Sequence, residues 1–177
     1  MREFVIRMSG SILACCFLIL GTACTGPTDA DHATTAAQVQ RIDDERQIRA
    51  LMVSYGQYLD SLDFERYSKL FADDGEWSGL LGEFTTVKGP AAIREAMERA
   101  FAERIYDPDH ITNVHVITNV KIDVDGDRAT GYSRWTVMSR DDEDRPLVRL
   151  TGRYDDVFER EDGQWKFRSR SARREIP

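Results

Sequence analysis

The stretch Val114-His115-Val116-Ile117-Thr118-Asn119-Val120-Lys121-Ile122-Asp123-Val124-Asp125-Gly126 carries the strongest structural signal in the sequence. Apolar residues occupy alternate positions, which is the period of a β-strand. Alternation places the valines and Ile122 on one face, and Asn113, His115, Ile117 and Asn119 on the other. Asp125-Gly126 favours a two-residue hairpin turn. The stretch therefore predicts a long strand that turns back into an antiparallel partner.

The residues after the hairpin extend this pattern to the end of the chain. Strands are predicted over residues 129–138, 147–159 and 164–172. The charged run 140–145 reads as a solvated loop, and Asp162-Gly163 as another turn. Consecutive strands joined in this way form an antiparallel meander of four long strands.

The residues before the hairpin have helical periodicity. A long amphipathic helix is predicted over 39–62, a second after the cap residue Asp63, and a third from Pro90. Asp73-Asp74-Gly75 should end the second helix in a turn, and short strands should follow at 76–79 and 83–88. The predicted class is α+β: three N-terminal helices packed in a curved antiparallel sheet, which leaves a conical cavity.

Composition excludes several classes of protein. The chain has 177 residues, which suits one domain, and 41% hydrophobic residues, which excludes global disorder. The formal net charge of −7 argues against a nucleic-acid partner and weakly disfavours anionic substrates. All three cysteines lie within the first 24 residues, so the body can form neither a disulfide nor a zinc–thiolate site.

The N-terminus is typical of an export signal. Residues 8–20 form an apolar run that is short for a membrane span and suits a signal peptide ending at residue 23. The segment up to Cys24 resembles a bacterial lipobox, in which that cysteine carries lipid. A lipoprotein, a soluble secreted protein and an uncleaved anchor all remain open. The first two place the body outside the cytoplasm, in the periplasm or elsewhere in the cell envelope, with membrane contact only through Cys24.

The mature chain is expected to have two parts. Residues 24–37 are small and polar, and because they cannot pack a core they predict a flexible tether. Residues 38–177 should form the folded domain.

Five segments, in order, resemble the SnoaL-like polyketide cyclases of the nuclear transport factor 2-like superfamily. The similarity spans about residues 38–172, and the segments that carry it are Ile48-x-x-Leu51-x-x-x-Tyr55-x-x-x-Leu59-Asp60-x-x-Asp63, Leu70-Phe71-Ala72-Asp73-Asp74-Gly75-Glu76-Trp77, Lys88-Gly89-Pro90-x-x-Ile93, His115-x-x-Thr118-Asn119-x-x-Ile122-x-Val124-Asp125-Gly126-Asp127-x-Ala129 and Asp162-Gly163-x-Trp165-Lys166-Phe167-x-x-Arg170. The resemblance implies the same α+β cone, and a homodimer or homotrimer assembled through the sheet.

The resemblance also implies catalytic residues. In scytalone dehydratase and hexachlorocyclohexane dehydrochlorinase, an Asp at the end of the first helix pairs with a His on the sheet, and Asp60 and His115 match these positions. Arg170 matches an Arg of the last strand in many relatives. A His oriented by a carboxylate is an ordinary base near neutral pH, and an Arg can stabilise developing negative charge. The set suits a lyase or isomerase that needs neither metal nor organic cofactor.

Each of these residues also has a structural interpretation. Asp60 could end its helix or cap the next one, His115 could be a structural histidine, and Arg170 could belong to a solvated basic edge. Candidate substrate-binding residues are Tyr55, Tyr58, Trp77, Asn119 and Trp135, of which the aromatic ones could equally be core. Gly56, one helical turn before Asp60, could make room for a ligand or for a closely packed strand.

Three functions therefore stay open. The first is a cofactor-independent lyase or isomerase that acts on a small apolar or cyclic molecule through Asp60 and His115. The second is an exported, non-catalytic protein that binds such a ligand or a partner protein. The third is a protein that only assembles through its sheet face.

Overall fold

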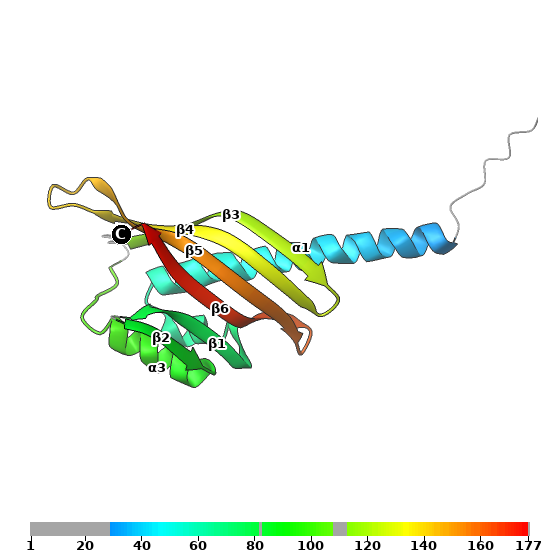
Figure 1. The fold of residues 1–177 in the computed structure, drawn as a ribbon, viewed down its shortest axis with the longest axis horizontal. Helices are drawn as coiled ribbons and strands as arrows, with labels where there is room; N and C mark the ends of the chain where they lie inside the picture. The colour runs from blue at the N-terminus through cyan, green and yellow to red at the C-terminus, as the bar shows by residue number, and fades with distance from the viewer. Residues whose placement is uncertain (1–28, 82, 108–112, 177) are drawn as a thin grey trace, which may run out of the picture.

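The computed structural model describes residues 29–81, 83–107 and 113–176. Helices and strands follow the predicted order along the chain (Figure 1). They are α1 (Asp29–Asp60), α2 (Phe64–Ser68), β1 (Phe71–Leu81), β2 (Glu83–Lys88), α3 (Pro90–Ala100), β3 (Asn113–Asp125), β4 (Arg128–Arg140), β5 (Pro146–Glu161) and β6 (Gln164–Ile176). The predicted α+β class and the four-strand meander are confirmed.

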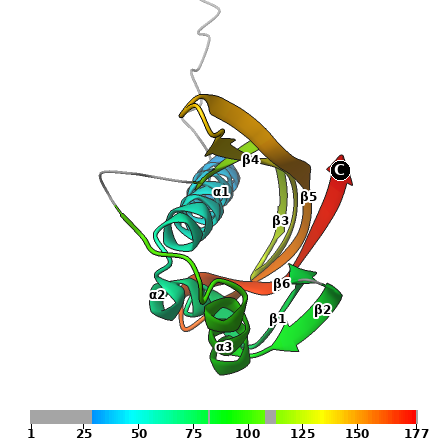
Figure 2. The same ribbon diagram turned by 90° about the vertical axis from the view of Figure 1, so that its left-hand side faces the viewer.

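The six strands form one sheet in the order β2-β1-β6-β5-β4-β3. Neighbours pair antiparallel except β1 and β6, which run parallel. Figure 2 shows the sheet curving around α1, with α3 beside β1 and α2 between α1 and α3. The concave face buries one cluster of aromatic and aliphatic side chains against the helices, including Ile48, Met52 and Tyr55 of α1 and Phe158 and Phe167 of the sheet. Each such side chain contributes about 1.5–3 kcal/mol on burial.

The first helix is longer than predicted. It begins at Asp29, so residues 29–37 are helical rather than a flexible tether. Residues 29–37 are solvent-exposed and contribute no side chain to the core, as their small and polar composition predicts. Four alanines in it favour helix, because alanine has the highest helix propensity. Figure 1 shows the N-terminal part of α1 projecting beyond the sheet.

The predicted signal peptide, Cys24 and the first residues of the predicted tether lie outside the described residues. Within the described part of the chain, no helix is long and apolar enough to cross a membrane.

The predicted turn at Asp73-Asp74-Gly75 is wrong. The second helix ends at Ser68, and β1 already begins at Phe71. The pairing of β1 with β6 shifts register between Phe71 and Glu76, so the three residues form an irregularity inside a strand. Gly75 is required there because a Cβ would lie 2.7 Å from the carbonyl oxygen of Phe167.

The predicted faces of β3 are also wrong, because the strand contains a bulge. Its pairing with β4 shifts register between Thr118 and Lys121, and Asn119 has a φ of 51°. An extra residue reverses the side-chain alternation beyond it. Ile122 is therefore buried whereas Val114 is 43% exposed. His115 and Ile117 join the inner face and lie against α1 at Gly56.

Two glycines give opposite predictions for substitution. A Cβ on Gly56 would sit at ordinary contact distance, 3.7 Å from the nearest atom, so the strand and not a ligand occupies this space. We expect Gly56→Ala to stabilise the fold by up to about 1 kcal/mol, since alanine favours the helix interior. At Gly152 a Cβ would lie 2.1 Å from the carbonyl oxygen of Arg173. Gly152→Ala should therefore destabilise the fold by about 1–3 kcal/mol.

Urea unfolding of both variants measures these free energies. Loss of stability in Gly56→Ala comparable to that in Gly152→Ala would contradict the packing of α1 against β3.

Candidate functional site

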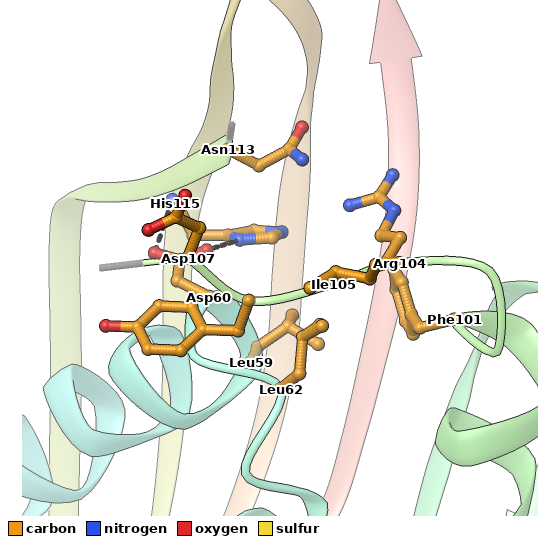
Figure 3. Close-up of a pocket in the computed structure, with 10 residues that line it drawn as sticks. Leu59, Asp60, Leu62, Phe101, Arg104, Ile105, Asp107, Asn113 and His115 are labelled. Carbon is orange, nitrogen blue, oxygen red and sulfur yellow. Dashed lines mark hydrogen bonds and ion pairs between the residues drawn. The ribbon is translucent and has the colours of Figure 1, made fainter. Parts of the chain in front are cut away.

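Asp60 and His115 meet where the end of α1 lies against β3. The backbone N–H of His115 donates to Asp60 Oδ2 at 2.9 Å, and the imidazole Nδ1 lies 2.5 Å from Asp60 Oδ1. Both side chains are partly buried, with exposed fractions of 19% and 14%. The predicted contact between the two residues is therefore present (Figure 3).

Helix capping does not explain Asp60. A negative charge at a helix C-terminus opposes the helix dipole. The cap of α2 is Asp63, whose Oδ1 accepts from the backbone N–H of Arg66 at 3.0 Å. Both oxygens of Asp60 are instead directed at His115.

This arrangement selects one tautomer of the imidazole. Asp60 is a carboxylate and can only accept, so Nδ1 must carry the hydrogen that joins them. In the neutral ring, Nε2 is then the acceptor, and it has no hydrogen-bond partner among the described residues. The pair therefore presents a basic nitrogen whose orientation is fixed from behind.

A cavity of about 360 Å³ lies inside the cone, and His115 is one of its lining residues. Its walls come from α1, α2, α3 and the sheet, and they are mainly aromatic and aliphatic: Tyr55, Leu59, Tyr67, Trp77, Leu80, Leu81, Met97, Phe101, Trp135, Val137, Leu150, Tyr154 and Ala172. A smaller cavity beside it is lined by Asp60, His115 and Arg104 (Figure 3). The volume suits a small organic ligand.

Hydroxyl groups interrupt the apolar wall. Tyr55 accepts a hydrogen bond from Trp77 Nε1 at 3.1 Å, which leaves its own hydrogen available to a neighbour. The buried hydroxyl of Tyr67 has no hydrogen-bond partner in the described part of the chain. Burial, followed by the neighbouring Tyr55, raises the pKa of Tyr67 well above its ordinary value, so it remains a donor.

Three of the five predicted substrate-binding residues line the large cavity: Tyr55, Trp77 and Trp135. Tyr58 and Asn119 do not. The ring of Tyr58 faces the guanidinium of Arg66, 5.3 Å away. Asn119 is the exposed residue of the β3 bulge, so it is not on the face that strict alternation predicted.

Arg170 faces inward but lies in the core, beneath the cavity. A register shift between β5 and β6 brings it to the inner face, where it donates two hydrogen bonds to Asp156 at 2.8 and 2.7 Å. Its Cζ lies 4.0–4.2 Å from the ring centres of Tyr55, Tyr154 and Phe167. Burial lowers the pKa of Arg170 and the Asp156 charge raises it, with a net rise, so the guanidinium stays charged.

This placement differs from both predicted roles. The side chain of Arg170 is fully buried, so it is not part of a solvated edge. Its hydrogen bonds are directed at Asp156 rather than at the cavity, so the structure does not bring it to Asp60 and His115.

Sequence reasoning missed the cations of the cavity. Arg104, Arg149 and Arg174 line it, from the segment after α3, from β5 and from β6. Arg174 belongs to the basic edge predicted around Arg170, but it was not predicted to line a cavity, and no sequence signal singled out Arg104 or Arg149. The described residues contain no group of three or more His, Cys, Asp or Glu that could hold a metal ion.

The three helices, the curved sheet and the cavity between them define an α+β cone. The family model of the SnoaL-like domain matches residues 40–171, and the chain belongs to this family. A search of curated proteins found no significant match.

Solved structures with the same fold include proteins from two bacteria. An NTF2-like protein with a cystatin-like fold from Novosphingobium aromaticivorans is 26% identical, with a TM-score of 0.68 over 82% of this chain and 90% of that one. A protein provisionally assigned as a scytalone dehydratase, from the same organism, is 26% identical, with a TM-score of 0.64 over 78% and 89%. A protein of unknown function from Mycobacterium tuberculosis is 25% identical, with a TM-score of 0.64 over 78% and 75%.

If Arg170 has a structural role, breaking its buried ion pair with Asp156 should lower the stability of the fold. Arg170→Met leaves the Asp156 carboxylate buried without its partner, and we expect a loss of about 3–5 kcal/mol. Removing both charges in Arg170→Met/Asp156→Leu should recover most of this loss. Urea unfolding measures both variants, and wild-type stability in the single variant would contradict the structural role.

Proposed function

We propose that the cavity is the active site of a cofactor-independent lyase or isomerase in which His115 is the base. The observation that carries the proposal is the pair of hydrogen bonds from His115 to Asp60, which leaves Nε2 as the accepting nitrogen at a cavity wall. The 26% identical protein provisionally assigned as a scytalone dehydratase supports elimination chemistry. The mainly apolar lining supports a small apolar or cyclic body for the substrate.

The proposed step is removal of a proton from a substrate carbon by His115 Nε2. The C–H electron pair forms a new double bond. In an elimination a leaving group departs with its own electron pair, and in an isomerisation a carbon elsewhere is reprotonated. Asp60 stabilises the imidazolium that forms, because its carboxylate accepts the Nδ1 hydrogen throughout. The hydroxyls of Tyr55 and Tyr67 are the donors available for developing negative charge.

A second candidate is a protein that binds the same ligands without converting them. The cavity favours it, because a mainly apolar volume of about 360 Å³ needs no catalytic pair to hold a ligand. The two candidates differ in whether His115 exchanges a proton with the ligand.

We also propose that the protein is exported and forms a homo-oligomer, as the sequence predicts. Residues 1–23 and Cys24 support export to the bacterial cell envelope, with a lipid anchor or as a secreted protein, and family resemblance supports a homodimer or homotrimer. The intact mass of the mature protein distinguishes a lipidated Cys24 from an unmodified one.

Proton exchange between ligand and solvent tests the catalytic proposal. Cyclic ketones and hydroxylated aromatic compounds are incubated with the protein in D₂O, and carbon-bound deuterium is measured by mass spectrometry. We expect exchange with the wild type, and a fall of about 10²–10⁴-fold in His115→Ala and Asp60→Asn. The matched control is His32→Ala, because His32 lies on the exposed start of α1.

Undiminished exchange in His115→Ala would contradict the proposal. Tight binding with no exchange in any variant would favour the second candidate.

A further inference from the structure

Three arginines from separate parts of the chain line the same cavity. Arg104 follows α3, Arg149 lies on β5 and Arg174 lies on β6. All three residues are exposed, whereas the aromatic residues that line the cavity are largely buried. The cations therefore form a rim around an apolar interior. In Figure 3 the guanidinium of Arg104 lies on the side toward which the His115 ring extends.

The rim arginines differ from most others in the protein. Thirteen described arginines pair with carboxylates within 4.0 Å, including exposed pairs such as Arg94–Glu98 and Arg99–Glu95. Among residues 29–81, 83–107 and 113–176, no carboxylate pairs with Arg104, Arg149 or Arg174.

The other contacts of the rim arginines leave their charges available. The Arg104 guanidinium lies 4.9 Å from the ring centre of Phe101, and Arg174 Nε donates to the carbonyl oxygen of Ile176 at 3.4 Å. Neither a ring nor a carbonyl carries a compensating charge.

Two of the three charges, Arg104 and Arg149, lie close enough to repel each other. Partial burial of its side chain, followed by the Arg149 charge, lowers the pKa of Arg104 from its ordinary value. The acidic groups beside Arg104 are Asp60, which is directed at His115, and Asp107. In a chain with a net charge of −7, a group of cations without acidic partners is a local reversal of the overall charge. A bound anion would relieve the repulsion between these like charges.

We propose that the cavity binds an amphipathic organic anion, with an apolar ring-sized body inside and a carboxylate held by the arginine rim. The planar guanidinium fork matches a carboxylate, and the lining matches the apolar body. A single negative charge suits a protein that is itself acidic. This inference rests on the proposed function in one respect: it takes the cavity to be the substrate site. It also narrows the substrate class, against the expectation that net charge disfavours anions.

The test compares two ligands that differ in one charge. Naphthalene-2-carboxylate and its neutral amide have the same ring system, and quenching of Trp77 and Trp135 in the cavity wall reports binding. We expect the carboxylate to bind at least about tenfold more tightly than the amide at low salt. Added NaCl should weaken the carboxylate complex and leave the amide complex unchanged.

Charge-neutralising variants locate the anion. Arg104→Gln, Arg149→Gln and Arg174→Gln should each weaken carboxylate binding by about three- to tenfold and leave amide binding unchanged. Arg128→Gln is the matched control: this exposed arginine of β4 forms no ion pair with another described residue and does not line the cavity. Circular dichroism confirms that each variant is folded.

Several outcomes overturn the inference. Equal affinity for the two ligands, binding of neither, or equal loss in Arg128→Gln and the rim variants would each do so. Carboxylate binding can be tested separately from catalysis, because His115→Ala removes the proposed base but keeps all three rim arginines. Arginine-dependent carboxylate binding without proton exchange would refute the catalytic proposal and leave the anion site standing. Proton exchange on neutral ligands, without arginine-dependent binding of the carboxylate, would refute the anion site and leave the catalytic proposal standing.

Discussion

The carboxylate of Asp60 joins the end of α1 to β3 through two hydrogen bonds from a single residue. Hydrogen bonds to a charged group contribute about 1.5–3 kcal/mol each, which exceeds the cost of about 0.3–1 kcal/mol for a negative charge at a helix C-terminus. The contact fixes the helix against the sheet beside the cavity and fixes the imidazole at the same time. Fold and site therefore share one interaction.

Charge compensation separates the structural cations of this protein from those available to a ligand. Arg170 is buried, is bonded through two nitrogens to Asp156 and lies among three aromatic rings, so its charge is already matched. The rim arginines have no carboxylate partner in the described part of the chain. The charge of Arg170 in the core is therefore neutralised by Asp156, whereas the charges of the arginines around the cavity rim are not.

Most of the fold could be predicted from sequence, because periodicity and turn residues are local signals. The meander, the Asp125-Gly126 hairpin and the helix starting at Pro90 are where the pattern placed them. The errors in the sheet came from bulges. The extra residue at Asn119 reversed the faces of β3, and the irregularity before Glu76 turned a predicted turn into strand. Bulges depend on pairing with a distant strand, which a single strand's sequence does not reveal.

The site was predictable to a different degree for each residue. Family resemblance placed Asp60 and His115, and the structure brings them into hydrogen-bond contact. Resemblance also pointed to Arg170, but only the structure supplies Asp156, fourteen residues away on β5, as its partner. The rim arginines were missed because they come from three separate segments, which only the curvature of the sheet and the packing of α3 bring together.

The central claim is that Asp60 sets the tautomer of His115, and a substitution that keeps its shape tests it. The backbone N–H of His115 can only donate, so in Asp60→Asn the amide oxygen must accept it and the amide NH₂ must face Nδ1. The neutral ring would then carry its hydrogen on Nε2. The most direct measurement is ¹⁵N NMR of the His115 ring at a pH where it is neutral, with His32 as an exposed reference. The account predicts hydrogen on Nδ1 in the wild type and on Nε2 in Asp60→Asn, and the same tautomer in both proteins would contradict it.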